Sequence, residues 1–395
     1  MKRITITLLA AALGLSVFAG CASNNPGGTT SSGGTIKIGV ATEQSGAVAS
    51  YGSDILKGVQ MATDEINSAG GINGQQITLV SYDTKSDPQT ATQMATKLAT
   101  QDKVAAMVGP ATSGSFMAAI PVANQNKVPI VSGSATADAA MVDNNGNVQT
   151  FAFRTCVNDS FQGSAAAQFG LNTLHAKTAV IYEDNSSPYG VGLAKTFNDA
   201  FMAGGGTIVD TQSFAAGDTD FSAVLTKFKN EQFDMMYVPG YYQEAGLIIK
   251  AARGMGINVP VMGDDGYDSP TLKDLGGADA LNNVFFTNHY SALNQDPKVT
   301  AFVAAFKAKY GADPSGFNAM GYDTMKFIAD AITRAGSTDG QAIADAMAST
   351  TNFSAVTGTL SVDSATHNVV KSIVVVELKD GDQSAATVVA PPSAS

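Results

Sequence analysis

The chain has 395 residues, of which 44% are hydrophobic and only 14% are charged, against about 25% charged residues in a typical soluble protein. At roughly 100–200 residues per domain, this length predicts two or three folded parts. The 23 Lys and Arg against 34 Asp and Glu give a net charge of −11, which argues against a nucleic-acid partner because phosphate binding needs a basic surface. The two Cys and three His lie far apart in the sequence, so we expect no metal and no cofactor.

The first 34 residues have the pattern of an export signal followed by a tether. Lys2 and Arg3 precede an apolar run over residues 4–18, which is shorter than the about 20 residues that span a bilayer. The small residues before Cys21 resemble a bacterial lipobox, so we predict a signal at 1–20 and lipidation of Cys21; an ordinary signal with a chance Cys is the alternative. The polar segment 21–34 predicts a flexible tether. Loss of the signal removes two bases and no acid, so the net charge becomes −13.

From residue 35 onward, short β-branched runs alternate with amphipathic segments that begin at Ser, Thr, Asp or Pro and stop at Gly. This alternation is typical of βαβ units around a parallel sheet. In the first part of the chain it predicts strands at 36–40, 76–82, 104–108 and 129–132, with helices at 52–69, 88–100 and 113–124.

The same alternation starts again after residues 151–154, which predicts a second lobe. It predicts strands at 178–182, 207–214, 235–238 and 259–262, with helices at 160–174, 190–203, 221–229 and 244–253. The remaining elements are a crossover at 283–289, helices at 297–310, 318–334 and 340–347, and an antiparallel pair of strands at 358–362 and 369–378. The predicted fold class is α/β, with two doubly wound, Rossmann-like lobes.

Sequence motifs for catalysis are missing. The chain contains no G-x-S-x-G, no G-x-x-x-x-G-K-[ST] and no H-E-x-x-H. Gly190 and Gly192 resemble half of a dinucleotide-binding fingerprint, but Lys195 stands where its third glycine belongs. We therefore do not expect an enzyme, and we predict no catalytic residue.

Small and hydroxyl-bearing residues follow two neighbouring strands of the first predicted sheet. Ser113 comes after strand 104–108, and Ser134, Ala135 and Thr136 come after strand 129–132. Open α/β sheets bind ligands at the carboxyl ends of their strands, and a helix N-terminus favours an anion. These residues are suited to a carboxylate, although the same Ser and Thr side chains could equally cap helices.

The second predicted sheet offers the complement at its own strand ends. Tyr189, Tyr241 and the pair Asp264-Asp265 follow three of its strands. An acid and phenol groups can hold an ammonium group, although a solvated loop would also explain the two Asp residues. The two lobes together are suited to the zwitterion of an α-amino acid.

The chain resembles the leucine/isoleucine/valine-binding proteins, which are periplasmic binding proteins of type I fold and the substrate-binding components of ABC importers. The resemblance spans residues 36 to about 378. It rests on the order and spacing of motifs at 38–40, 45–52, 58–74, 82–88, 108–109, 189–194, 220–223, 240–242 and 262–263.

The resemblance implies roles for individual residues. Ser113, Ser134, Ala135 and Thr136 match positions that bind the ligand, with hydroxyl and N–H groups taking its carboxylate, and Asp265 matches the acid that holds the ammonium. The matching aromatic positions are Tyr51, Tyr189 and Tyr241. Asn318 stands where leucine binders carry an apolar or aromatic pocket residue, which leaves a ligand with a small or polar side chain open.

The resemblance also implies how the protein works. Two lobes, at 35–156 plus 289–368 and at 157–288 plus 369–382, would close on an amino acid by hinge motion, before a disordered tail at 383–395. The three crossovers are expected near 155–158, 287–290 and 366–370. The expected protein is a monomeric, extracytoplasmic receptor that is anchored to the membrane only through the lipid on Cys21 and delivers its ligand to an ABC permease. A sensing module for amino acids or amides, acting through a signalling partner, is the alternative.

Overall fold

The computed structural model describes residues 34–143 and 145–391. The predicted signal at 1–20 and the lipidation site Cys21 lie outside the described residues. The described chain forms two large sheets, mostly parallel, and one small antiparallel sheet. The predicted α/β fold with two lobes is confirmed, with one large sheet in each lobe.

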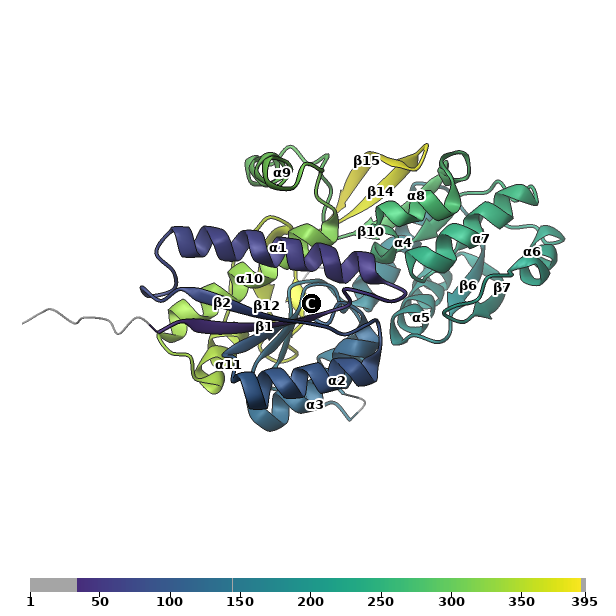
Figure 1. The fold of residues 1–395 in the computed structure, drawn as a ribbon. Coiled ribbons are helices and arrows are strands. Elements are labelled where there is room, and N and C mark those ends of the chain that lie inside the picture. The colour runs from purple at the N-terminus through teal and green to yellow at the C-terminus, as the bar shows by residue number, and fades with distance from the viewer. Residues whose placement is uncertain (1–33, 144, 392–395) are drawn as a thin grey trace, which may run out of the picture. The chain divides into compact units, whose positions relative to one another are not determined.

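The first lobe is built on a parallel sheet of five strands. These are β1 (Ile36–Thr42), β2 (Ile77–Asp83), β3 (Ala106–Val108), β4 (Ile130–Ser132) and β5 (Ala152–Arg154). Their order is β2-β1-β3-β4-β5, and all four pairings are parallel. The helices of this lobe are α1 (Ala49–Ser68), α2 (Pro88–Lys97), α3 (Ser113–Asn126), α9 (Pro297–Tyr310), α10 (Gly316–Ala335) and α11 (Gly340–Ala348). Figure 1 shows α1 on one side of the strands and α2 and α3 on the other, so both faces of the sheet are covered.

The second lobe is built on seven strands. These are β6 (Thr178–Asp184), β7 (Thr207–Phe214), β8 (Met235–Tyr237), β9 (Val261–Gly263), β10 (Val284–Asn288), β14 (Ile373–Lys379) and β15 (Asp382–Val389). Their order is β15-β14-β10-β9-β8-β6-β7, and the five strands β6 to β10 pair in parallel. The helices of this lobe are α4 (Asp159–Asn172), α5 (Pro188–Ala203), α6 (Ser222–Lys229), α7 (Tyr242–Gly254) and α8 (Pro270–Gly276).

The last part of the chain differs from the prediction. The strand expected at 369–378 is divided in two: β13 (Val369–Val370) pairs with β12 (Gly358–Val362), whereas β14 pairs with β10. β12 also pairs with β11 (Phe353–Ala355) to complete the three-stranded sheet. The run Ile-Val-Val-Val that opens β14 is buried at every position, so it suits a strand inside a large sheet. The third connection between the lobes therefore spans residues 371–372 instead of 366–370.

The disordered tail expected at 383–395 is also wrong for most of its length. β15 pairs antiparallel with β14 from Asp382 to Val389 and forms the edge of the seven-stranded sheet. Its exposed positions carry Asp, Ser, Ala, Thr and Val, which give no alternating apolar pattern in the sequence. Residues 392–395 lie outside the described residues.

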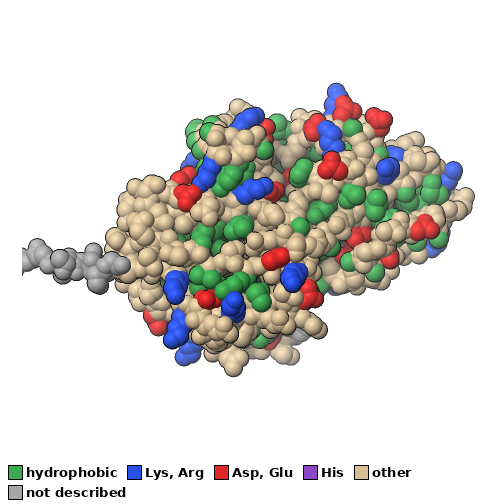
Figure 2. All heavy atoms as spheres, viewed as in Figure 1, with side chains coloured by type: hydrophobic (Ala, Val, Ile, Leu, Met, Phe, Trp, Pro, Cys, Tyr) green, Lys and Arg blue, Asp and Glu red, His purple; other side chains and the backbone are tan. Residues whose placement is uncertain are grey.

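The surface agrees with the low charge content of the sequence. Figure 2 shows acidic and basic side chains mixed over the face in view, with wide uncharged areas between them. Within 34–143 and 145–391, we find no helix that combines the length and the apolar character needed to cross a bilayer.

A buried polar network joins the ends of three strands in the second lobe. Asp264 follows β9, and its carboxylate accepts hydrogen bonds from the Tyr237 hydroxyl on β8 at 2.7 Å and from the Thr287 hydroxyl on β10 at 3.1 Å. Burial raises the pKa of Asp264 to about 7. The network holds the strand ends together. Burying the charged carboxylate costs free energy, because water no longer solvates it.

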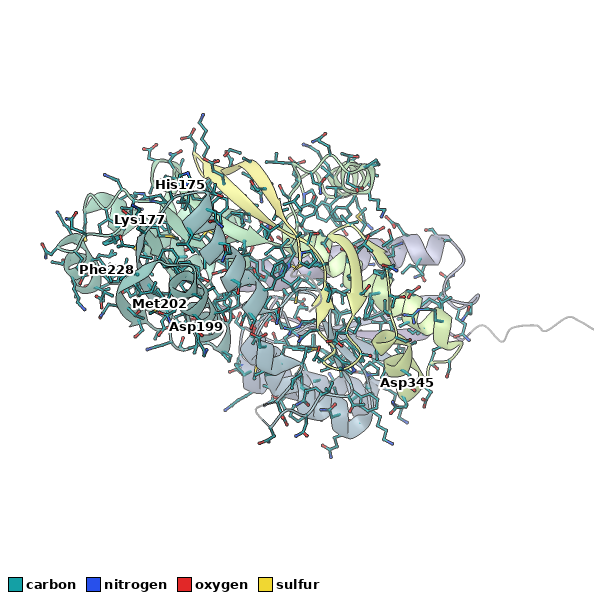
Figure 3. The ribbon with its side chains drawn as sticks, turned by 180° about the vertical axis from the view of Figure 1, so that it is seen from behind. His175, Lys177, Asp199, Met202, Phe228 and Asp345 are labelled. Atoms are coloured by element: carbon teal, nitrogen blue, oxygen red, sulfur yellow. The ribbon has the colours of Figure 1, made fainter. Side chains whose placement is uncertain are left out.

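Phe228 tests the core of the second lobe. It is buried on α6 against Tyr182 and Phe233, whose ring centroids lie 5.8 and 6.2 Å from its own. We expect Phe228→Ala to lower the free energy of unfolding by about 3–5 kcal/mol, because it removes a buried ring and leaves a cavity. Met202 on α5 is 56% exposed and serves as the control, for which Met202→Ala should stay within about 0.5 kcal/mol. Figure 3 labels both residues, and equal losses in urea unfolding would contradict this view of the core.

Replacing Asp264 measures how much free energy the burial of its carboxylate costs. Its pKa is raised in the folded chain, so the folded state binds a proton more tightly than the unfolded state, and stability falls as pH rises from about 4 towards 7. Asp264→Asn removes this penalty. We therefore expect the stability of the variant relative to the parent to increase by up to about 4 kcal/mol between pH 4 and pH 8. Thermal melts of both proteins across this range measure the effect, and a pH-independent difference would refute it.

Candidate functional site

The strand ends of both lobes meet at one small cavity. It lies within one compact unit of the chain. The lining residues are Tyr51, Ala111, Thr112, Ser113, Ser134, Tyr189, Tyr241, Asp265, Gly266 and Phe317. Six of the nine ligand-binding residues predicted from the sequence are among them.

Glu43 shapes the first-lobe side of the cavity. Its buried carboxylate accepts hydrogen bonds from the backbone N–H groups of Ala111 at 2.8 Å and Thr112 at 3.1 Å, and from the Thr112 hydroxyl at 2.9 Å. Burial raises the pKa of Glu43, and these bonds oppose that rise. Glu43 thereby fixes the loop between β3 and α3.

Ser113 and Ser134 join this loop to the loop that follows β4. The Ser134 hydroxyl donates to the carbonyl of Ala111 at 2.9 Å, and the Ser113 hydroxyl accepts from the backbone N–H of Ala137 at 3.2 Å. Thr112, the residue before α3, makes no side-chain cap on that helix. The uncapped first turn of α3 therefore brings backbone N–H groups and the positive end of the helix dipole to the cavity.

Asp265 provides the opposite charge on the second-lobe side. Its exposed fraction is only 2%, and its Oδ1 accepts from the Tyr189 hydroxyl at 2.8 Å and from Gln162 Nε2 at 3.2 Å. The Tyr189 hydroxyl also accepts from the backbone N–H of Gly266 at 2.9 Å. A Cβ on Gly266 would lie 2.7 Å from the carbonyl oxygen of Gly240, so this turn requires glycine. Asp265 is thus held in one orientation towards the cavity. Asp264 instead belongs to the buried network with Tyr237 and Thr287.

A neutral histidine lies behind the Asp265 carboxylate. His289 Nε2 is 3.3 Å from Asp265 Oδ2, but the two groups lack the alignment of a hydrogen bond. Burial lowers the pKa of His289, and the neighbouring Asp265 opposes that shift. No local pattern indicates this contact, because Asp265 and His289 lie on different segments of the chain.

Aromatic rings form the walls of the cavity. Tyr189 stacks on Tyr241 with ring centroids 5.1 Å apart, and Tyr51 stacks on Phe317 with centroids 4.1 Å apart. The Tyr51 hydroxyl reaches from the first lobe to the second, where it donates to the carbonyl of Gly266 and accepts from a backbone N–H at 3.3 Å. Tyr51 is therefore both a wall of the cavity and a bond between the lobes.

Three predicted ligand residues do not line the cavity. Ala135 and Thr136 are buried in the turn after β4, where both backbone carbonyls accept hydrogen bonds from Arg154. The buried Thr136 hydroxyl makes no hydrogen bond to another described residue.

Asn318, the third of these residues, lies away from the cavity. Its side-chain oxygen accepts from the backbone N–H of Ser315 at 2.8 Å, and its Nδ2 donates to the carbonyl of Asp54 at 2.8 Å. Ser315 and Asn318 form a capping box at the start of α10, which uses the polar atoms of Asn318. Asn318 lines a separate and larger cavity, and its neighbour Phe317 takes the place in the wall that the sequence had assigned to Asn318. The spacing Ser315-x-x-Asn318 is the signal that could have revealed this cap.

The site carries no sign of metal chemistry. Among the residues that the structure describes, no group of three or more His, Cys, Asp or Glu side chains is placed to hold a metal ion. The arrangement offers an anionic hydrogen-bond acceptor, Asp265, in one lobe, a helix N-terminus with free N–H donors in the other, and aromatic walls between them.

Comparisons with known proteins agree with this arrangement. A family model described as a periplasmic binding protein matches residues 35–383. A leucine-, isoleucine-, valine-, threonine- and alanine-binding protein of Pseudomonas aeruginosa is 34% identical over 330 residues, which are 83% of this chain and 86% of that protein.

Two solved structures share the fold over nearly the whole described chain. The branched-chain amino acid transporter substrate-binding protein LivJ from Streptococcus pneumoniae, in complex with isoleucine, is 42% identical with a TM-score of 0.85, covering 91% of this chain and 100% of that one. The leucine-binding protein LivK from Thermotoga maritima is 34% identical with a TM-score of 0.84, covering 90% of this chain and 99% of that one. The chain therefore belongs to the periplasmic binding protein family, alongside these branched-chain amino-acid binding proteins, and members of the family are substrate-binding proteins and not enzymes.

Proposed function

We propose that this protein is the extracytoplasmic receptor of an amino-acid ABC importer and that it binds a branched-chain amino acid between its lobes. The observation that carries the proposal is the opposed polarity of the cavity. Asp265 lies on one side, and the uncapped N-terminus of α3 with Ser113 and Ser134 lies on the other. The names of the relatives, which bind leucine, isoleucine or valine, support the same ligand class.

The main chain of an α-amino acid fits this polarity. Its carboxylate would accept hydrogen bonds from the first turn of α3 and the hydroxyls of Ser113 and Ser134. Its ammonium would donate to Asp265, which Tyr189 and Gln162 already orient. A ligand without one of these charges would leave a buried polar group without a partner, which is costly. The site thereby selects for the zwitterion.

The walls favour an apolar ligand side chain. The residues beside the polar groups are Tyr51, Tyr189, Tyr241 and Phe317, whose rings offer mostly carbon surface. With Asn318 used in the cap of α10, the polar wall expected from the sequence is replaced by Phe317. This replacement strengthens the case for a branched-chain side chain over a polar one.

Binding would couple to closure of the lobes. Three connections, near residues 155–158, 287–290 and 371–372, would act as the hinge, and closure would bury the ligand away from water. The charge-assisted hydrogen bonds to the ligand strengthen as water leaves. A permease would then recognise the closed arrangement. Recognition and release require no covalent step, in agreement with a family of binding proteins.

The location of the receptor follows from the sequence of its first 34 residues. We propose that residues 1–20 direct export, that Cys21 carries a lipid, and that the segment to residue 34 tethers a monomeric binding protein to the membrane surface. Radiolabelled palmitate incorporation that is lost in Cys21→Ser would support the anchor, and equal incorporation in both proteins would exclude it.

Asp265 tests the proposed ligand directly. We expect leucine, isoleucine or valine to raise the melting temperature of the parent protein, because a ligand that binds only the folded state stabilises it by about 2.7 kcal/mol at 100 times Kd. Asp265→Asn should weaken the affinity by roughly 10- to 100-fold, since it removes a charge-assisted hydrogen bond worth about 1.5–3 kcal/mol. Isothermal titration with each amino acid measures both effects.

Asp345 provides the matched control. It lies exposed on α11, where Figure 3 labels it, so Asp345→Asn should leave the affinity unchanged. The α-hydroxy analogue of leucine, which lacks the ammonium, should bind the parent weakly and should lose little further affinity in Asp265→Asn. Failure of every amino acid to bind the parent would refute the proposed function. Equal affinity of parent and Asp265→Asn would refute the assigned role of Asp265.

A further inference from the structure

Asp268 is a buried second-lobe carboxylate that does not line the ligand cavity. It lies three residues after Asp265, and its exposed fraction is 8%. Its Oδ2 accepts from Asn288 Nδ2 at 2.7 Å and from the backbone N–H of Gly316 at 2.7 Å, while its Oδ1 accepts from Gln383 Nε2 at 3.4 Å. Asn288 and Gln383 belong to the second lobe, but Gly316 is the first residue of α10 in the first lobe. Asp268 therefore bonds across the two lobes.

The bond from Gly316 to Asp268 satisfies an N–H group at the start of α10 that has no partner inside the helix. The first four N–H groups of a helix have no partner inside it. The capping box satisfies two of them at the start of α10, because the N–H of Asn318 donates to the Ser315 hydroxyl and the N–H of Ser315 donates to the Asn318 side chain. The N–H of Gly316 takes its acceptor from Asp268 instead. A carboxylate at a helix N-terminus is also favoured by the helix dipole.

The close approach depends on the missing side chain of Gly316. A Cβ at this position would lie 2.6 Å from Asp268 Oδ2 and 3.0 Å from Asn288 Oδ1. Both of these atoms belong to the second lobe, so the clash would arise only while the lobes are together. Gly316 is thus a glycine that the contact between the lobes requires, whereas α10 itself would accept alanine.

The contact is connected to the ligand cavity through the next residue. Phe317 lines the cavity and stacks on Tyr51, so the position of the first turn of α10 also sets an aromatic wall. Beside Asp268, the hydroxyls of Ser269 in the second lobe and Ser50 in the first lie 2.8 Å apart. The contact between Asp268 and Gly316 therefore stands next to other bonds that hold the lobes together.

We propose that Asp268 and Gly316 form a latch between the lobes, which sets the affinity for the ligand by stabilising the closed arrangement without touching the ligand. The latch rests on the proposed function only in its effect on amino-acid affinity, because closure itself can be measured without a ligand. The two residues act through Phe317 and the lobe contact, so they are positioning residues and not ligand contacts.

Disulfide trapping measures closure in the ligand-free protein. The pair Ser50→Cys and Ser269→Cys, in the full chain with Cys21→Ser, places two thiols where the hydroxyls now lie 2.8 Å apart. The remaining native Cys156 is buried. The rate of disulfide formation then reports how often the lobes close. We expect Gly316→Ala to slow this rate by about tenfold, because its Cβ opposes the closed arrangement.

Affinity and stability separate the latch from a folding defect. Titration at pH 8, above the pKa of about 6 to which burial raises Asp268, keeps this carboxylate ionised. Gly316→Ala should weaken leucine or isoleucine binding by about tenfold while leaving the melting temperature of the ligand-free protein unchanged or higher, since alanine favours a helix over glycine. Gly254→Ala on α7 is the control. Its Cβ would meet nothing within 4 Å, so neither trapping nor affinity should change.

The double variant tests the direct contact. Asp268→Ala should weaken affinity by leaving the N–H of Gly316 without its acceptor. Adding Gly316→Ala should then cost less than it does in the parent, because Asp268 Oδ2, the nearer clashing atom, is gone and only Asn288 Oδ1 at 3.0 Å remains. Losses that add fully, or a trapping rate unchanged by Gly316→Ala, would overturn the latch. If Gly316→Ala slows trapping while no amino acid binds the parent, the latch stands and the proposed function fails.

Discussion

The chemistry of this protein depends on keeping the carboxylate of Asp265 away from water. A buried charge is costly unless donors or an opposite charge surround it. The chain supplies donors in Tyr189 and Gln162, and it places His289 3.3 Å away. Burial lowers the pKa of that histidine, so it does not bring a matching positive charge at neutral pH. A ligand ammonium would supply the positive charge that Asp265 lacks. The surrounding residues would hold the carboxylate in place for it.

Among the described residues, the hydrogen bonds that join the lobes are mostly neutral. Tyr51 bonds to the backbone of the second lobe, the Tyr242 hydroxyl donates to the carbonyl of Ala47 at 3.1 Å, and Ser50 meets Ser269. Each such bond contributes only about 0.5–1.5 kcal/mol net, because the open lobes would bond to water instead. Closure would then be a balance of a few kcal/mol. A ligand that bonds to both lobes can shift a balance of that size.

Local patterns in the sequence predicted most of this architecture. The alternation of strands and helices located both large sheets, and the rule that ligands bind at the carboxyl ends of parallel strands brought Ser113, Ser134 and Asp265 to one cavity. These patterns could not predict contacts between distant segments. Neither the pairing of β14 with β10 nor the approach of His289 to Asp265 follows from periodicity. β15 was missed because an edge strand with Asp, Ser and Thr at exposed positions looks like a polar tail.

The register of α10 shows how a single residue changes the inferred ligand. Neighbouring positions on a helix point about 100° apart, so a wall that includes Phe317 cannot include Asn318 at the same place. Ser315 decides between them, because its capping box takes the side chain of Asn318 and so turns Phe317 towards Tyr51. An amide in that wall would favour a polar ligand, whereas a stacked phenyl ring favours an aliphatic one. The choice of ligand is in this way linked to the cap of a helix whose first N–H group is bonded to the opposite lobe.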